Sequence, residues 1–180
     1  MATLRVPVNR NDHILGSPRA FVTIVEYGDY QCPYCRAAEP QLNFVLARLG
    51  DRVARVFRHF PLTEIHPQAE VAAETAEFAG AYSRFWQMHE LIFANQPRLS
   101  PQLLYDLASR LGLSQIALHD ALTAETYAPK VQQDFMGGTR SGVAGTPTFF
   151  INGKRHDGGY SAGELMVAIE AEIETAAHPG

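Results

Sequence analysis

The chain has 180 residues, a hydrophobic content of 46% and a formal net charge of -4. This length is enough for one domain, or for one domain with a large insertion, and the apolar residues can fill a core without a disulfide staple. Acidic and basic residues are mixed along the chain, so there is no basic stripe of the kind that binds phosphates, and we expect no nucleic-acid partner.

Residues 1–12 contain no continuous apolar run of the length that a signal peptide needs. No segment approaches the roughly 18 apolar residues of a membrane span. We therefore expect a cytoplasmic protein without a membrane span. A chain from which a signal peptide had been removed would look the same, and that protein would be periplasmic or exported.

The first regular elements are a strand, a helix and a second strand. Residues 21–27 are rich in β-branched and aromatic residues, which predicts a buried strand. Apolar residues at helical spacing then predict a helix that ends at Gly50. Residues 52–60 alternate, with Val53, Val56 and Phe57 expected to point inward. This order favours a parallel βαβ unit with a right-handed crossover.

Residues 61–142 show only helical patterns. Five helices are predicted, over 66–79, 83–95, from Ser100-Pro101 onward, 114–123 and 127–136, with Ser83 as a possible cap of the second. The breaks between them are too short to be linkers between independent domains. The segment is therefore predicted to be an all-helical insertion in a single domain over 1–180.

Strand signals return after Gly145. Residues 148–151 predict a strand, Asn152-Gly153 a two-residue hairpin turn, and 154–157 the returning strand. A last helix follows, with Ser161 and Glu164 spaced as a capping box.

The only two cysteines are Cys32 and Cys35, in the stretch Cys32-Pro33-Tyr34-Cys35. A disulfide over so short a loop adds little stability, and such a pair in a reduced compartment is more often catalytic or metal-binding. Cys32 lies where a strand and turn give way to a helix, whose first N–H groups and dipole stabilise a thiolate. In such settings the thiol pKa falls to roughly 3.5–7.5. Cys32 is then the nucleophile, and Cys35 resolves the mixed disulfide.

Two further residues bear on this chemistry. Glu26 lies in an otherwise apolar strand, and if it is buried near the cysteines its raised pKa would allow it to exchange a proton with Cys35. It could equally point to solvent or pair with a cation. Thr146-Pro147 precedes the returning strand, and a trans peptide bond is the commoner state there. A cis bond would present the Thr146 backbone for pairing with an extended substrate beside Cys32.

The sequence resembles thioredoxin-fold proteins of the DsbA-like type over roughly residues 12–176. The segments that carry the resemblance are residues 21–27 with Glu26, 29–35, 58–62, 66–69, 85–89, 91–93 and 142–153. The cysteine motif, the helical insertion and the Gly-Thr-Pro strand in this order are highly specific for that type.

The resemblance implies an α/β thioredoxin fold, with a central mixed sheet flanked by helices, a core formed by 12–60 and 143–176, and an insertion over 61–142. It also implies a cis Pro147 facing a redox-active Cys32–Cys35 disulfide, a buried acid at Glu26, and substrate contacts by Pro33, Tyr34, Thr146 and Pro147. The Pro33-Tyr34 pair differs from the Pro-His of the strong oxidants and is typical of glutaredoxins. Cys32 should therefore be less acidic, and the protein less oxidising, than in those enzymes.

Together these features predict a dithiol–disulfide oxidoreductase that acts on protein or peptide thiols and disulfides. No cofactor or metal is expected, glutathione is a candidate co-substrate, and the direction of exchange and the recycling partner are left open.

One rival hypothesis is a metal-binding or redox-sensing thiol module without turnover, in which His59, His66 and His89 would complete a zinc site with the cysteines. Another is a peptide-binding domain that uses the insertion and the Thr146 edge. Phe85, Trp86 and Met88 could line a substrate groove, but residues of these types on a helix are more often core.

Overall fold

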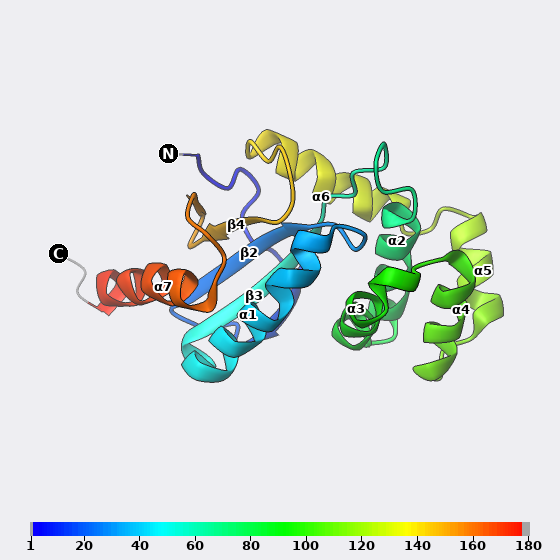
Figure 1. Ribbon diagram of the computed structural model, residues 1–180, viewed down its shortest axis with the longest axis horizontal. Coiled ribbons are helices and arrows are strands. Elements are labelled where there is room, and N and C mark those ends of the chain that lie inside the picture. The colour runs from blue at the N-terminus through cyan, green and yellow to red at the C-terminus, as the bar shows by residue number, and fades with distance from the viewer. Residues whose placement is uncertain (1, 178–180) are drawn as a thin grey trace.

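The computed structural model describes residues 2–177, in which one mixed sheet of five strands is flanked by helices (Figure 1). The strand order is β1-β3-β2-β4-β5. The bounds are β1 His13–Gly16, β2 Val22–Gly28, β3 Val53–His59, β4 Thr148–Ile151 and β5 Lys154–His156. The α/β thioredoxin fold predicted from the sequence is confirmed.

Strands β2 and β3 are parallel, as the strand–helix–strand order predicted, and Glu26 pairs in register with Phe57. Strand β4 runs antiparallel to β2, and β1 runs antiparallel to β3. The expected alternation in β3 was wrong, because all seven of its residues are buried. Helices cover both faces of this central strand, so that even Arg55 and Arg58 lie inside the protein.

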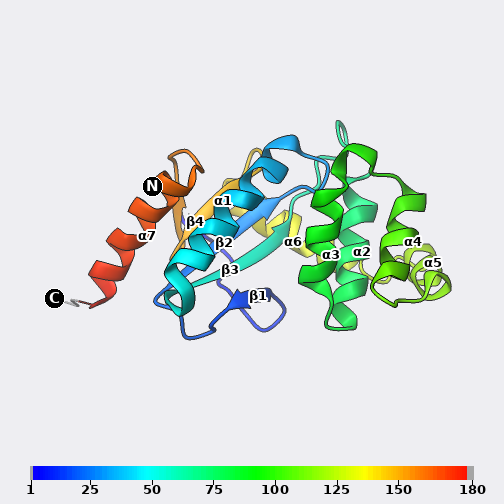
Figure 2. The ribbon, with the colours of Figure 1, turned by 60° about the horizontal axis from the view of Figure 1, so that its bottom comes forward.

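Two helices cover one face of the sheet and a third covers the other. Helices α1 (Pro33–Leu49) and α7 (Ala162–Ala177) share a core with Val22 and Ile24 of β2. Helix α6 (Ala128–Arg140) packs on the opposite face, where Phe135 stacks on Phe60 with ring centroids 4.4 Å apart. Figure 2 shows α1 in front of the sheet and α6 behind it. The cysteines therefore lie at the end of a helix that is held against the sheet along its length.

Helices α2 to α5 form a second layer at one end of the sheet (Figures 1 and 2). Their bounds are α2 Ala69–Ala81, α3 Phe85–Ala94, α4 Pro101–Arg110 and α5 Gln115–Thr123. With α6 they fill the chain between β3 and β4, where the only other regular element is the short 3-10 helix η2 (Gln96–Arg98), and no strand lies there within the described residues. Another 3-10 helix, η1 (Gly50–Arg52), joins α1 to β3.

Some helix starts agree with the predicted caps and one does not. Ser100 and Ser114 each accept a hydrogen bond from the backbone of their own helix, and Ser161 and Glu164 form the reciprocal capping box. The cap predicted at Ser83 was wrong. Arg84 is the N-cap residue of α3, and Ser83 lies in the preceding turn with a φ of 59°. Within residues 2–177, none of the helices is long and apolar enough to cross a membrane.

We expect Gly138→Ala to destabilise the fold, because a Cβ there would lie 2.7 Å from the Phe60 ring and 2.9 Å from the Tyr27 ring. Overpacking of this kind costs about 1–3 kcal/mol. Gly163→Ala is the matched control, since a Cβ at this other helical glycine meets no atom within 4 Å, and it should change stability by less than about 1 kcal/mol. Urea unfolding of the two variants checks this. Equal effects would show that α6 can move away from the sheet.

Candidate active site

Both cysteines lie at the amino end of α1, where the chain turns from β2 into the helix. Cys32 is the N-cap residue, with φ -73° and ψ 121°, and its carbonyl accepts the first helical bond, from the N–H of Arg36 at 3.2 Å. Pro33 occupies the first helical position, where its missing N–H has no intrahelical partner to lose. Both thiols are free, with Cys32 4% exposed and Cys35 fully buried.

The surroundings of Cys32 favour its thiolate. The hydrogen bond with the Cys35 side chain lowers the pKa of Cys32 most, and the Thr146 side chain and the backbone N–H groups of Tyr34 and Cys35 lower it further. Burial opposes these effects, but the pKa still falls to about 5. As a thiol, Cys32 Sγ donates to the Thr146 carbonyl at 3.4 Å. The buried Thr146 hydroxyl has no other partner, so it is available to donate to the thiolate.

The surroundings of Cys35 favour its thiol. Burial raises the pKa of Cys35 well above its usual value, and the hydrogen bond with Cys32 and the negative charge of Glu26 add to this. The one opposing contact is the backbone N–H of Asp29, which donates to Cys35 Sγ at 3.4 Å. Two thiols three residues apart therefore differ strongly in acidity.

The loop before β4 faces this pair. The Thr146-Pro147 peptide bond is cis, as the resemblance implied. Its Thr146 carbonyl contacts Cys32, which lies 114 positions earlier in the chain. Pro33 and Tyr34 are both exposed beside it, and the Tyr34 side chain is 64% exposed.

Glu26 is fully buried in β2, and it also pairs with a cation. Its Oε2 accepts from Arg55 Nη2 at 2.6 Å, whereas its Oε1 has no partner. Burial raises the pKa of Glu26, the charge of Arg55 opposes this, and the resulting pKa is about 7. The sequence left open whether Glu26 is buried or paired with a cation, and in the structure it is both.

Arg55 also binds a second glutamate, which the sequence analysis missed. Its Nη1 donates to Glu39 Oε2 at 3.1 Å, and its Nη2 donates to Glu39 Oε1. Arg55 lies in the centre of β3, and Glu39 comes from the second turn of α1. Burial works against the ionisation of Glu39, but His89 and Arg55 outweigh it and lower its pKa to about 2. The position of Arg55, a charged residue in a mainly apolar strand, is the feature of the sequence that could have indicated a buried ion pair here.

A neutral histidine extends the network to the cysteine loop. Burial lowers the pKa of His89 to about 4, despite the nearby Glu39. We assign its proton to Nε2, which donates to Glu39 Oε2 at 3.1 Å, so that Nδ1 accepts from the Tyr30 hydroxyl at 3.0 Å. Tyr30 is two residues before Cys32 and is itself buried. The network therefore connects the cysteine loop with α1, α3 and β3.

Asp29 fixes the same loop from the other side. It is buried, and its Oδ1 accepts from the Gln31 N–H at 2.7 Å. Its Oδ2 accepts from the Leu62 N–H and contacts His66 Nδ1, both at 2.8 Å. The turn before Cys32 is thus bonded to the loop that follows β3.

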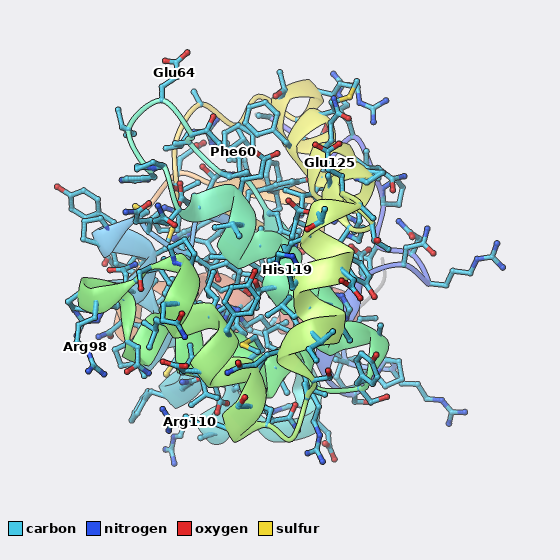
Figure 3. The ribbon with its side chains drawn as sticks, turned by 90° about the vertical axis from the view of Figure 1, so that its right-hand side faces the viewer. Phe60, Glu64, Arg98, Arg110, His119 and Glu125 are labelled. Atoms are coloured by element: carbon cyan, nitrogen blue, oxygen red, sulfur yellow. The ribbon has the colours of Figure 1, made fainter. Side chains whose placement is uncertain are left out.

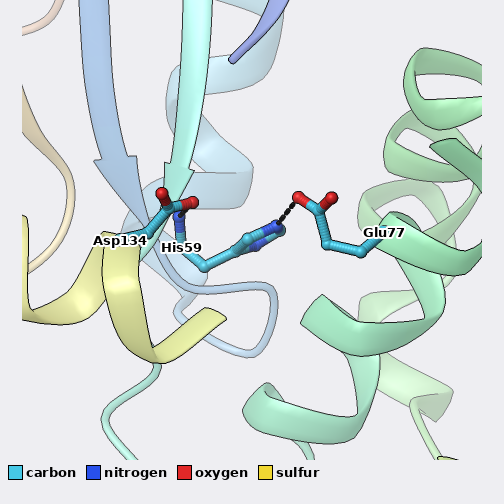
Figure 4. Close-up of side chains that lie close together, drawn as sticks. All are labelled: His59, Glu77 and Asp134. Carbon is cyan, nitrogen blue, oxygen red and sulfur yellow. Dashed lines mark hydrogen bonds and ion pairs between the residues drawn. The ribbon is translucent and has the colours of Figure 1, made fainter. Parts of the chain in front are cut away.

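The zinc hypothesis required three histidines around the cysteines, and the structure directs them elsewhere. His66 contacts Asp29 and His89 contacts Glu39, while His59 contacts Glu77 at 2.8 Å. Among the described residues, one group of acids and histidines lies close enough together to hold a metal ion, and it consists of His59, Glu77 and Asp134 without a cysteine (Figure 4).

The members of that group already have partners. Asp134 accepts from the His59 N–H at 3.2 Å and from Lys130 at 2.6 Å, and the second oxygen of Glu77 contacts His13 at 2.9 Å. In Figure 4, Asp134 lies beside the His59 backbone and Glu77 beyond its ring. We interpret these bonds as ties between β1, β3, α2 and α6.

The aromatic residues of α3 belong mainly to the core, as expected. Phe85 and Met88 are buried, and Trp86 packs against the same cluster. The Trp86 ring also lies 5.5 Å from the Arg55 guanidinium carbon, so that it covers one face of that cation.

We expect Thr146→Val, which removes only the hydroxyl group, to raise the pKa of Cys32 by roughly 1, the effect of losing one hydrogen bond to a charged group. Absorbance of the thiolate near 240 nm, followed from pH 3 to 9, measures this pKa. Thr148→Val is the matched control, since the Thr148 hydroxyl donates to the Gly145 carbonyl instead. An unchanged titration in Thr146→Val would show that the hydroxyl does not contact the thiolate.

Curated proteins that resemble this chain are longer than it, and each of them matches it over only one part of its own length. It is 44% identical over 167 residues to Na(+)/H(+) antiporter NhaA 1 of Salinispora arenicola, covering 92% of this chain and 26% of that protein. It is 38% identical over 172 residues to Na(+)/H(+) antiporter NhaA 1 of Mycobacterium sp. (strain KMS), covering 94% and 28%. The chain thus spans about a quarter of the length of the curated relatives it matches.

Solved structures and a family model agree on the fold. BdbD from Bacillus subtilis, in its oxidised form, is 28% identical, with a TM-score of 0.84 over 96% of this chain and 98% of BdbD. The α-DsbA1 protein of Wolbachia pipientis shares the fold with a TM-score of 0.82 at 22% identity, over 97% and 96% of the two chains. Residues 8–171 match the family model described as Thioredoxin. The chain therefore belongs to the thioredoxin family, and helices α2 to α6 lie between β3 and β4 of its sheet.

Proposed function

We propose that this domain is an oxidoreductase that exchanges thiols and disulfides with protein or peptide substrates through Cys32 and Cys35. The observation that carries the proposal is the opposite displacement of the two thiol pKa values, to about 5 for Cys32 and well above the usual value for Cys35. A nucleophile must be a thiolate at working pH, whereas a resolving thiol must stay protonated until the mixed disulfide has formed.

In the reducing direction, the Cys32 thiolate attacks one sulfur of a substrate disulfide and the other sulfur leaves as a thiolate. Cys35 then loses its proton and attacks Cys32 Sγ. This breaks the mixed disulfide, forms the Cys32–Cys35 disulfide and releases the second substrate thiolate. Two electrons pass from the pair to the substrate, and the reverse sequence oxidises a substrate dithiol.

Glu26 is the group proposed to accept the Cys35 proton. Its pKa of about 7 leaves it partly ionised at neutral pH, and its Oε1 has no other hydrogen-bond partner. Its charge is close enough to raise the pKa of Cys35. A base whose pKa lies near the working pH can both take up and return a proton.

Substrate chains are proposed to lie across Pro33, Tyr34 and the Thr146-Pro147 loop. This edge is supported by the 3.4 Å contact between Cys32 Sγ and the Thr146 carbonyl, which places backbone polar groups next to the nucleophile. The exposed Tyr34 ring adds an apolar surface at the same place.

The remaining partners stay predictions. Glutathione is a candidate co-substrate for recycling the pair, and none of the comparisons supports the cytoplasmic setting expected from the sequence. The proposal concerns the thioredoxin domain, and ion transport is not part of it.

Trapping of the mixed disulfide tests the proposed roles. With a peptide that contains one disulfide, Cys35→Ser should accumulate a covalent adduct, because the resolving thiol is missing, and Cys32→Ser should give neither adduct nor turnover. Mass spectrometry of the intact protein detects the adduct, and circular dichroism controls for folding. A folded Cys32→Ser protein that exchanged disulfides at the normal rate would contradict the assignment, and a metal-binding or redox-sensing module would show no turnover even with both cysteines.

A second prediction concerns the proton. The rate at which Cys35 resolves a preformed mixed disulfide should rise with pH through about 7, since Glu26 must be ionised to accept the proton. In Glu26→Gln this inflection should disappear, and the rate at pH 7.5 should fall by at least about tenfold.

Stopped-flow measurement of the released thiol, from pH 5.5 to 9, gives the profile. Glu77→Gln is the control, because it alters another buried glutamate that is bonded to His13 and His59. A profile in Glu26→Gln that kept its inflection would exclude Glu26 as the base.

A further inference from the structure

A cavity away from the cysteines lies between the loop after β3 and the helices α2, α5 and α6. It has a volume of about 590 Å³. Its walls come from that loop, from α2, from the end of α5 and from the first turns of α6. Figure 3 shows this side of the molecule, with Glu64 at the outer tip of the loop and Glu125 beside the start of α6.

Three glutamates and no basic residue line the cavity. They are Glu70 and Glu74 on α2 and Glu125 in the turn before α6. Within residues 2–177 none of the three forms an ion pair. The described residues thus provide no cation that pairs with these three carboxyl groups.

Glu74 sets this cavity apart from an ordinary acidic surface. It is 8% exposed, and its buried Oε2 has no hydrogen-bond partner. Burial raises the pKa of Glu74 to about 7, and the charges of Glu70 and Glu125 add to this, while the Ala128 N–H at the start of α6 opposes it. Leaving a buried carboxylate oxygen unpaired costs free energy, which a donor or cation in the cavity would recover.

The rest of the lining is mixed: Thr63 and Gln132 are polar, and the other side chains are apolar. Val71, Leu122, Val131 and Phe135 contribute aliphatic and aromatic surface beside the carboxylates. Among the described residues, the carboxylate oxygens of the three glutamates do not lie close enough together to hold a bare metal ion. Separated carboxylates in a lining that also carries polar and apolar side chains instead fit an extended organic cation.

We propose that this cavity binds an alkylammonium or alkylguanidinium group, with Glu74 as its buried anionic contact and Glu70 and Glu125 at the rim. Such a group is supplied by a lysine or arginine side chain of a polypeptide or by a free polyamine. The loop that forms one wall is bonded through Leu62 to Asp29, three residues before Cys32. A basic side chain of a polypeptide held here would therefore lie against the loop that supports the cysteine turn.

Isothermal titration calorimetry at low salt tests the proposal with two probes. One is spermidine, and the other is a capped nine-residue peptide of glycine, serine and alanine with one central lysine. The same peptide with glutamine in place of lysine is the blank. Binding of the lysine peptide alone would identify polypeptides as the source, and binding of spermidine alone would identify free polyamines. Binding of both would leave the shared cation as the determinant.

Glu74→Gln should weaken binding by about tenfold or more, since it removes the buried charge and keeps the shape. Glu64→Gln is the matched control: it changes the net charge equally, but Glu64 is exposed and outside the lining, and binding should stay within about twofold. Neither variant touches Cys32, so reduction by glutathione should be unchanged in both.

Three results would overturn the proposal: no binding of either probe at millimolar concentration, equal weakening in the two variants, or binding of calcium chloride but of neither organic cation. If Glu74→Gln failed to fold, amide chemical shifts of the unaltered chain would decide. Spermidine or the lysine peptide should then shift the Ala128 and Gln132 signals, and shifts confined to other surfaces would contradict the site.

Discussion

The buried guanidinium of Arg55 is the interaction on which the site depends. Two carboxylates, Glu26 and Glu39, lie inside the protein next to it, and neither could be buried as an anion without a cation between them. One positive charge cannot fully compensate two negative ones. Glu39 takes two of the three bonds and a further one from His89, so its pKa falls, while Glu26 keeps one bond and its pKa rises. Burial thus raises the pKa of Glu26, and its small share of Arg55 opposes this only in part, so that the pKa is about 7.

The positions of the two thiols on α1 separate their pKa values. Cys32 is the N-cap of α1, where N–H groups of the first turn point toward its sulfur. Cys35 lies one turn further along, in the core and near the charge of Glu26, and the Asp29 N–H only partly offsets their effect on its pKa. The difference follows from their positions on a helix that packs against β2 and β3, so any sequence that keeps α1 in place keeps most of it.

The sequence predicts those features of the structure that depend on residues close together in the chain. The strand with Glu26, the helix starts at Ser100 and Ser114, and the Asn152-Gly153 turn follow from neighbouring residues, and all were predicted. Arg55 was missed because only the apolar residues Val53, Val56 and Phe57 were named as inward, although Arg55 shares the face of Val53 and Phe57.

Glu39 was missed for a different reason, and His89 was named only as a possible zinc ligand. Glu39 lies on α1 and His89 on α3, and these two helices come into contact only in the folded chain. The cavity around Glu74 is likewise formed by two separate segments, 61–74 and 122–135, and no spacing in the sequence indicates that they meet.

The Pro33-Tyr34 pair provides no cationic side chain that could stabilise the thiolate. In the strong oxidants a histidine between the cysteines stabilises the thiolate, and its absence led us to expect a less acidic Cys32. The pKa of about 5 arises here from Cys35, from Thr146 in a distant loop and from backbone N–H groups. Tyr34 instead offers an uncharged, exposed ring. The acidity of Cys32 is therefore set by its hydrogen bond with Cys35, by Thr146 and by the first N–H groups of α1, and not by the Tyr34 ring.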